Sequence, residues 1–323
     1  MEINSKRTLQ IFAGRSNPQL AQEIATQLKQ PLGTVEVATF ANGEIYCRFE
    51  ESVRGNDVYV IQAHSAPVNE AIMEQCIMID ALKRASAGRI TAVCPYYGYS
   101  RQDKKARSRE PIAARLVADM LTAAGAGRVI SVDLHTGQIQ GFFDFPFDHL
   151  TALPLLADWV RTEVPGDVVV VSPDAGRVKV TERMASMLQS DVAILYKRRS
   201  TDVRNESETL AVVGDVEGRH CILVDDMIDT AGTICGAATL LKDHGAVEVD
   251  ALATHGIFSN PAIDRLKNAP IERIVVTNTV PIADDRRFDK LTVLSAAPIV
   301  AKAIRAVFED TSVSEIFAGN NQP

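Results

Sequence analysis

The segment Cys221-Ile-Leu-Val-Asp225-Asp226-Met-Ile-Asp229-Thr230-Ala231-Gly232-Thr233 decides the fold. It starts as an apolar run typical of a buried strand, reaches two adjacent carboxylates, and passes through small residues into the helical pattern of residues 234–242. A strand that leads directly into a helix is the repeating unit of α/β proteins, in which helices cover a mainly parallel sheet.

The turn in this segment has the chemistry of a sugar-phosphate site. Backbone N–H groups of residues 230–233 can be exposed at the start of the helix, where the dipole and the unpaired donors attract a phosphate dianion. Asp225 and Asp226 come at the carboxyl end of the strand, and vicinal ribose hydroxyls are natural donors to a carboxylate pair. A lone Asp pair would more often only cap a helix. The combination instead predicts a sugar-phosphate site at Asp225, Asp226, Asp229, Thr230, Ala231, Gly232 and Thr233.

Similar alternation of short β-branched runs and helix-period stretches extends along the chain. The expected strands are residues 57–62, 90–94, 129–133, 168–172, 221–224, 249–254 and 274–278. The expected helices include residues 69–85, 113–124, 181–188 and 237–244. The fold class is therefore α/β, with central, mainly parallel sheets flanked by helices.

A sequence pattern that repeats after 120 residues predicts two similar domains. Gly125-Ala126, a strand and His135 return as Gly245-Ala246, a strand and His255. Two unrelated helix-to-strand units would share some of these features, so duplication is one of two interpretations. The expected division is 1–152, 153–300 and a C-terminal helix and tail, 301–323, that packs back toward the N-terminal domain.

Composition restricts the class of protein. With 323 residues, 46% hydrophobic and 23% charged, the chain is long enough for two globular cores. A net charge of −7 opposes broad nucleic-acid binding, and no apolar run approaches the length of a membrane span. The five cysteines form no Cys-x-x-Cys pair, which argues against a disulfide framework and a thiolate metal site. The expectation is a cytoplasmic protein without nucleic-acid or membrane partners.

The segment around Asp225 resembles the signature of the phosphoribosyltransferase superfamily, and further segments resemble ribose-phosphate pyrophosphokinases of class I. These segments are 40–44 (Phe-Ala-Asn-Gly-Glu), 96–104 (Tyr-Tyr-Gly-Tyr-Ser-Arg-Gln-Asp-Lys), 133–144 and 197–199 (Lys-Arg-Arg). The resemblance extends over nearly the whole chain, from about Ile11 to Phe317. It implies two phosphoribosyltransferase-like domains, transfer of the β,γ-diphosphate of ATP to ribose 5-phosphate, and a homohexamer.

The same resemblance assigns an ATP site. Its expected residues are Phe40, Asn42, Gly43, Glu44, Arg101, Gln102 and Asp103. The residues of segment 40–44 correspond to a loop that a neighbouring subunit contributes to the adenine and ribose. An amide or a carboxylate can read the adenine amino group, and Arg101 can stack or pair with phosphate. Many bacterial members carry Asp where Asn42 stands, which leaves the hydrogen-bond polarity at this position open.

Five cations in residues 101–109 form a basic segment, which in isolation fits a solvated face or a nucleic-acid patch as well as a nucleotide site. By resemblance, Lys105 and Arg109 belong to a regulatory site for phosphate as activator and ADP as inhibitor. The full expected set is Ser52, Arg54, Lys105, Arg109, Gln140, Asp148, Ser312, Ser314 and Phe317. His149 departs from the Asn that is common at its position.

His135 and Asp174 match positions that the family associates with Mg²⁺. A carboxylate is an ordinary ligand for this ion, whereas Mg²⁺ prefers oxygen to imidazole nitrogen. We therefore expect His135 to act partly through a water or by hydrogen bonding to a phosphate. Residues 172–176 resemble a pyrophosphate-binding loop, although Arg177 stands where many members have a second glycine.

The polar stretch that begins with Lys197-Arg198-Arg199 has no apolar period and predicts a mobile lid. Three consecutive cations alone would indicate only a soluble surface. The resemblance makes Lys197 and Arg199 the catalytic pair, with Arg199 also contacting ribose 5-phosphate. Two rival functions stay open: an ordinary phosphoribosyltransferase, and a catalytically silent homologue that regulates an active partner.

Overall fold

The computed structural model describes residues 7–198 and 209–317, and it confirms the α/β class. The chain divides into two compact units. Unit 1 comprises Met1–Thr151, Thr279–Pro281 and Ser295–Pro323, and unit 2 comprises Ala152–Asn278 and Ile282–Leu294. Each unit is built around its own central sheet.

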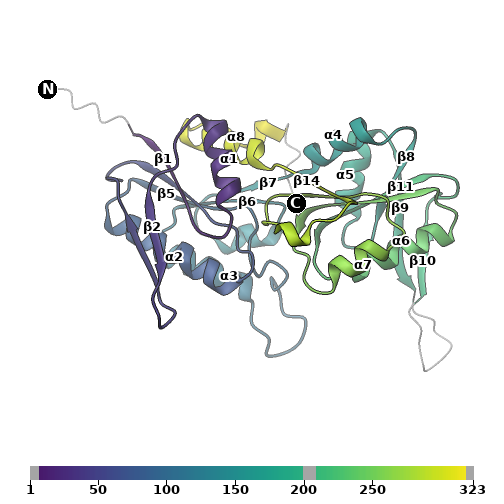
Figure 1. Ribbon diagram of the computed structural model, residues 1–323, viewed down its shortest axis with the longest axis horizontal. Helices are drawn as coiled ribbons and strands as arrows, with labels where there is room; N and C mark the ends of the chain where they lie inside the picture. The colour runs from purple at the N-terminus through teal and green to yellow at the C-terminus, as the bar shows by residue number, and fades with distance from the viewer. Residues whose placement is uncertain (1–6, 199–208, 318–323) are drawn as a thin grey trace. The chain divides into compact units, whose positions relative to one another are not determined.

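Unit 1 contains a five-stranded parallel sheet (Figure 1). Its strands, in spatial order, are β1 (Leu9–Ala13), β4 (Asp57–Ile61), β5 (Arg89–Cys94), β6 (Arg128–Val132) and β7 (Phe147–Leu150). A separate antiparallel hairpin is formed by β2 (Val35–Thr39) and β3 (Ile45–Phe49). Because all five strands are parallel, their carboxyl ends meet at one edge of the sheet.

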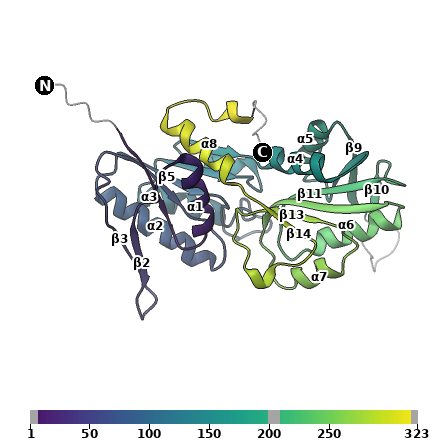
Figure 2. The same cartoon turned by 45° about the horizontal axis from the view of Figure 1, so that its top comes forward.

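Helices cover both faces of this sheet because successive strand residues point to opposite sides. On one face, Val58 and Val60 pack with apolar residues of α2 (Val68–Arg84) and α3 (Ala113–Ala124). Helices α1 (Pro18–Leu28) and α8 (Ala297–Phe308) pack on each other and contact β1 and β7, respectively. Figure 2 shows α1 and α8 side by side, although about 270 residues separate them in the sequence.

Unit 2 contains a seven-stranded sheet that is parallel except for the edge pair β10–β9. In spatial order its strands are β10 (Thr209–Val213), β9 (Asp191–Arg198), β8 (Val168–Ser172), β11 (His220–Ile228), β12 (Glu248–Gly256), β13 (Ile274–Thr277) and β14 (Leu291–Leu294).

The central strands of unit 2 are apolar on both faces because helices cover both. Val169 and Val171 of β8 pack with apolar residues of α6 (Gly232–Asp243) and α7 (Ala262–Asn268). The alternate residues Val168 and Val170 pack with α4 (Leu153–Glu163) and α5 (Val178–Leu188). This arrangement explains why the strand reads as an unbroken apolar run.

The strand order of unit 2 reverses between β8 and β11. From β8 the chain passes to β9 on one side, and after β10 it returns to β11 on the other side of β8. Loops at the carboxyl ends of β8 and β11 therefore diverge, and open α/β sheets bind ligands in the crevice that such a reversal creates. Segment 172–176 and segment 225–233 both lie at this switch point.

The seven strands expected from the sequence are all present, but β11 is longer than expected. The predicted strand 221–224 continues to Ile228, because its ladder with β12 runs on to Gly256. Asp225 and Asp226 thus belong to the strand itself and not to the turn after it. Among residues 7–198 and 209–317, no helix is long and apolar enough to cross a bilayer.

Candidate active site

The two carboxylates of unit 2 are held by the β11–β12 ladder. Asp225 stands opposite Ala253, and its Oδ1 accepts a hydrogen bond from the backbone N–H of Asp226 at 2.8 Å. Asp226 is buried, with 6% of its surface exposed, whereas Asp225 is half-buried. The pair is therefore fixed in position before any ligand binds.

Arg177 bridges these carboxylates from the loop after β8. Its Nε lies 3.1 Å from Asp225 Oδ1, and its Nη2 lies 2.7 Å from Asp226 Oδ1. Burial raises the pKa of Asp225 well above its usual range, and the neighbouring Asp226 carboxylate raises it further, while Arg177 lowers it. Burial and the neighbouring negative charge thus favour protonation of Asp225, and the Arg177 guanidinium opposes it.

The predicted phosphate site is the turn between β11 and α6. Thr230, Gly232 and Thr233 are exposed, and α6 begins at Gly232 without a side-chain cap from Ala231. The first N–H groups of a helix have no partner within the helix and are typical donors to an anion. Ala231 adopts a left-handed φ of 61°, and its carbonyl accepts the N–H of Cys235 at 3.0 Å. A second cation supports the turn, since Arg265 Nη1 of α7 donates to the Thr230 carbonyl at 3.0 Å.

The loop after β8 is a compact turn around Asp174. Its Oδ1 accepts the N–H of Gly176 at 2.8 Å, and its carbonyl accepts the Ser172 hydroxyl at 2.7 Å. Asp174 itself is exposed. A carboxylate has about four acceptor positions, so it retains room for a further ligand.

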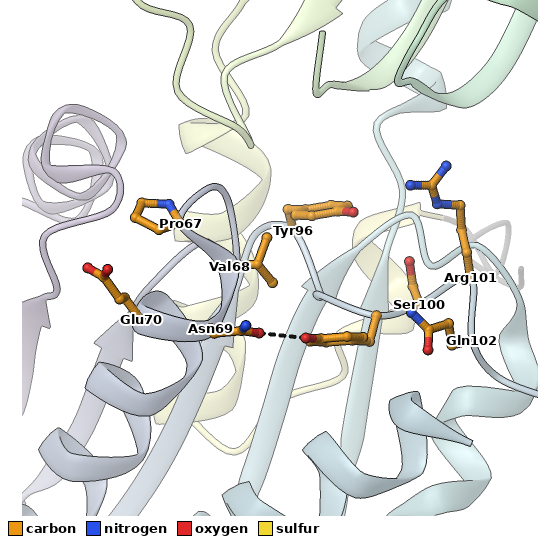
Figure 3. Close-up of a pocket in the computed structure, with 9 residues that line it drawn as sticks. Pro67, Val68, Asn69, Glu70, Tyr96, Ser100, Arg101 and Gln102 are labelled. Carbon is orange, nitrogen blue, oxygen red and sulfur yellow. Dashed lines mark hydrogen bonds between the residues drawn. The ribbon is translucent and has the colours of Figure 1, made fainter. Parts of the chain in front are cut away.

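A pocket of about 540 Å³ lies in unit 1 between the start of α2 and the loop after β5. Figure 3 shows side chains from both segments around it, with Arg101 and Gln102 at one end. The lining residues are Pro67, Val68, Asn69, Glu70, Tyr96, Tyr99, Ser100, Arg101 and Gln102. The Tyr99 hydroxyl donates to Asn69 Oδ1 at 2.5 Å and so ties the loop to the helix.

A buried network supports the loop that carries Arg101. The N–H of Gly98 donates to His64 Nδ1 at 3.1 Å, and His64 Nε2 lies 2.7 Å from Gln75 Oε1. Because Nδ1 accepts, the proton of the ring is on Nε2 and donates to Gln75. Burial lowers the pKa of His64 to about 4, which keeps the ring neutral.

Asp103 joins the basic segment to the loop after β6. It is buried and accepts hydrogen bonds from the Thr136 hydroxyl, at 2.6 Å, and from the Gln138 amide. His135 immediately precedes these residues and is half-buried. The structure thus brings Asp103 and the His135 loop together, and Asp103 holds that loop in place.

Comparison with known proteins matches both units to one family. Residues 9–125 match the N-terminal domain of ribose phosphate pyrophosphokinase, and residues 181–318 match the phosphoribosyl synthetase-associated domain. The ribose-phosphate pyrophosphokinase of Streptomyces coelicolor is 55% identical over 318 residues, which are 98% of this chain and 98% of that protein. The chain belongs to the ribose-phosphate pyrophosphokinase family.

Two further relatives agree with this membership. The ribose-phosphate pyrophosphokinase of Mycobacterium tuberculosis is 53% identical over 319 residues, which are 98% of each chain. The crystal structure of phosphoribosylpyrophosphate synthetase from Mycobacterium smegmatis superposes with a TM-score of 0.89 at 54% identity, and covers 94% of this chain and all of that one. The chain is therefore an enzyme of the pyrophosphokinase type, and an ordinary phosphoribosyltransferase or a silent homologue is not favoured.

In this pyrophosphokinase, the segment 40–44 forms the exposed tip of the β2–β3 hairpin. Phe40 is 54% exposed, although its ring lies 5.8 Å from that of Tyr46. Glu44 donates its N–H to Asn42 Oδ1 at 3.1 Å, and Gly43 has a positive φ of 91° that few other residues adopt. The residues of the tip do not line the pocket of Arg101.

Lys197 lies in β9, opposite Leu210 of β10. The predicted lid begins at the end of β9, and its residues 200–208 lie outside the part of the chain that the structure describes. Arg199 lies outside the residues that the structure describes.

The nine residues predicted to bind regulators all belong to unit 1. Asp148 pairs with Arg128 at 2.5 Å, and Gln140 Nε2 donates to the Gly137 carbonyl at 3.2 Å. Phe317 is buried, whereas Ser52, Arg54, Lys105, Arg109, Ser312 and Ser314 are exposed.

Within the described parts of the chain, no three His, Cys, Asp or Glu side chains form a cluster that could enclose a metal ion. Mg²⁺ often takes only one or two carboxylates from a protein and the rest of its ligands from water and substrate phosphates. Asp174, exposed and with spare acceptor positions, fits such an open site.

Sequence reasoning missed several residues that the structure places at these sites. In the sequence, Arg177 stands out only because it replaces a glycine, and its two carboxylate partners are 48 and 49 residues away. Arg265 and His64 likewise act across the fold. Asn69 could have been selected from the sequence, because it stands in the first turn of a helix that follows Pro67.

Proposed function

We propose that this enzyme transfers the β,γ-diphosphate of MgATP to the 1-hydroxyl of ribose 5-phosphate, which yields 5-phosphoribose 1-diphosphate and AMP. The observation that carries the proposal is the pairing of Asp225 and Asp226 with the open N-terminus of α6 at the switch point of unit 2. Carboxylates suit the ribose diol, and the helix N-terminus suits the 5-phosphate. The relatives named as ribose-phosphate pyrophosphokinase and phosphoribosylpyrophosphate synthetase match 98% and 94% of this chain, respectively.

In the proposed reaction the 1-hydroxyl oxygen forms a bond to the β-phosphorus as the bond from that phosphorus to the α,β-bridging oxygen breaks. AMP leaves with the bridging oxygen, and the hydroxyl proton passes to solvent or to a phosphate oxygen. Phosphoryl transfer of this kind depends mainly on in-line positioning and on neutralisation of charge. Residues 225–233 hold the acceptor, and no nucleophilic side chain is required.

The nucleotide is assigned to unit 1, at Arg101, Gln102 and Asp103. Arg101 lines a pocket that also offers aromatic surface from Tyr96 and amide groups from Asn69 and Gln102. The exposed hairpin tip with Phe40, Asn42, Gly43 and Glu44 fits the role of a loop donated to a neighbouring subunit. A homohexamer would supply that neighbour.

Mg²⁺ is the proposed cofactor, held by Asp174 with His135 as a water-mediated or phosphate-directed partner. When bound, the ion neutralises phosphate oxygens of the nucleotide. The exposed carboxylate of Asp174 supports this assignment, because Mg²⁺ prefers oxygen ligands and tolerates an open protein site.

Lys197 and Arg199 are the proposed catalytic pair, with Arg199 also on ribose 5-phosphate. The place of Lys197 near the end of β9 and the polar sequence that follows it support a lid that brings cations to the transferring group. Phosphate as activator, ADP as inhibitor and a cytoplasmic location complete the proposal.

The proposed function is tested by incubating the purified protein with ribose 5-phosphate, MgATP and inorganic phosphate, and separating the nucleotides by ion-exchange chromatography. We expect AMP, and not ADP, in an amount equal to the ribose 5-phosphate consumed. Asp225→Asn should abolish AMP formation, and Arg161→Gln, an exposed change on α4, should not. Absence of AMP from folded protein would favour the silent homologue, and consumption of added 5-phosphoribose 1-diphosphate with a free base would favour a phosphoribosyltransferase.

A further inference from the structure

Arg177 occupies an unusual position in the sugar site of unit 2. It follows Gly176 in the loop after β8, and its backbone opens α5, since its carbonyl accepts both the N–H and the hydroxyl of Thr181 at 3.0 Å. Its side chain leaves this helix and reaches the carboxylates at the end of β11. One residue thus links the two strand ends that flank the switch point.

The contact is buried and uses two different guanidinium nitrogens. The side chains of Arg177, Asp225 and Asp226 are 11%, 18% and 6% exposed, respectively. Nε pairs with Asp225 at 3.1 Å and Nη2 with Asp226 at 2.7 Å, so the planar fork sets the spacing and orientation of both carboxylates. A lysine could supply the charge but not this fork.

The pairing with Arg177 does not use all the hydrogen-bond acceptor positions of Asp225 and Asp226. Each ionised carboxylate has about four acceptor positions, and Arg177 contacts one oxygen of each. Two neighbouring hydroxyls of a ribose ring therefore still find acceptors. To accept hydrogen bonds from both hydroxyls, the two carboxylates must be ionised and correctly oriented, and a bridging cation favours both conditions.

We propose that Arg177 is a positioning residue for the ribose diol, and that it acts through Asp225 and Asp226 to set the affinity for ribose 5-phosphate and the preference for ribose over 2-deoxyribose. This inference rests on the proposed function and deepens it. The alternative is a purely structural ion pair. Its loss would lower stability and change the kinetic constants equally for sugars with and without the 2-hydroxyl.

The test compares initial rates of wild type, Arg177→Gln and Arg177→Lys, with Arg161→Gln as a control that removes a cation from an exposed ion pair of the same unit. We expect Arg177→Gln to raise KM for ribose 5-phosphate by about 10-fold or more, with KM for ATP within about twofold of wild type. The kcat/KM ratio of ribose 5-phosphate over 2-deoxyribose 5-phosphate should fall in the same variant. The KM and the sugar preference of Arg177→Lys should lie between those of wild type and Arg177→Gln.

An unchanged KM for ribose 5-phosphate in Arg177→Gln would overturn the inference. An equal fold-reduction of kcat/KM for both sugars and for ATP would overturn it as well. If Arg177→Gln does not fold, Arg177→Lys carries the test by the same criteria: a raised KM with a narrowed sugar preference supports the inference, and wild-type values overturn it. A wild-type protein that forms no AMP overturns the proposed function itself, an outcome that is visible before any variant is made.

Discussion

The backbone N–H of Gly98, in the loop that carries Arg101, donates to Nδ1 of the fully buried His64 at 3.1 Å. This bond requires a neutral ring, because a protonated imidazole has no acceptor. The stability of unit 1 is therefore coupled to the protonation of one histidine.

We predict an acid-labile contribution from His64. Its pKa is about 4 in the folded protein and near 6.5 when exposed, so between these values only the unfolded chain takes up the proton, and stability falls as pH falls. Over this window the loss amounts to roughly 3 kcal/mol. Urea unfolding at pH 7.5 and pH 5 should show a smaller pH dependence in His64→Asn than in wild type. The exposed His244→Asn serves as control, and an equal pH dependence in wild type and His64→Asn would contradict the prediction.

Tyr99→Phe should weaken nucleotide binding while leaving the fold intact. The hydroxyl joins the loop to α2 through Asn69, and a hydrogen bond of this type contributes about 1 kcal/mol. We expect KM for ATP to rise about fivefold, with KM for ribose 5-phosphate unchanged. Tyr97→Phe is the matched control, because its hydroxyl bonds the Ala114 carbonyl in the core and does not line the pocket. An equal change in both variants would show that the loop is merely destabilised.

Lys197→Ala should lower kcat by about 100-fold or more, with a smaller change in either KM. In the proposed reaction, Lys197 interacts with the transferring group mainly in the transition state. Steady-state kinetics at saturating substrates measure the effect, and Lys179→Ala, an exposed change on α5, is a comparison for loss of a surface lysine in the same unit. A variant that loses affinity but keeps kcat would place Lys197 in ground-state binding instead.

If the nine predicted regulatory residues form a separate site, part of the inhibition by ADP should persist at saturating ATP. Arg54→Gln should reduce this component and leave the activity without ADP within about twofold, since Arg54 is exposed in unit 1 and lies outside the Arg101 pocket. Inhibition curves at several ATP concentrations make the measurement. Purely competitive inhibition would remove the proposed regulatory site.

The sequence predicted those parts of the fold that local pattern controls. Burial on both faces makes β8 and residues 221–224 of β11 apolar runs, and the small residues after Asp229 predicted the turn into α6. The β2–β3 hairpin escaped notice because its strands are only partly buried, and β9 because its last residues, Lys197 and Arg198, read as polar loop.

Contacts between distant segments could not be predicted. The extension of β11 through Asp225 and Asp226 depends on a ladder with β12, which overrides the low strand propensity of Asp. Arg177 and its carboxylate partners come together only through the strand order of unit 2.

The most direct test of the central claim is ³¹P NMR of the reaction mixture formed from ribose 5-phosphate and MgATP. We predict equal amounts of AMP and of a product with one 5-phosphate resonance and two mutually coupled resonances, which shows that the diphosphate moved intact to the 1-hydroxyl. Formation of ADP with a sugar bisphosphate, whose phosphorus nuclei are not coupled to each other, would contradict the account.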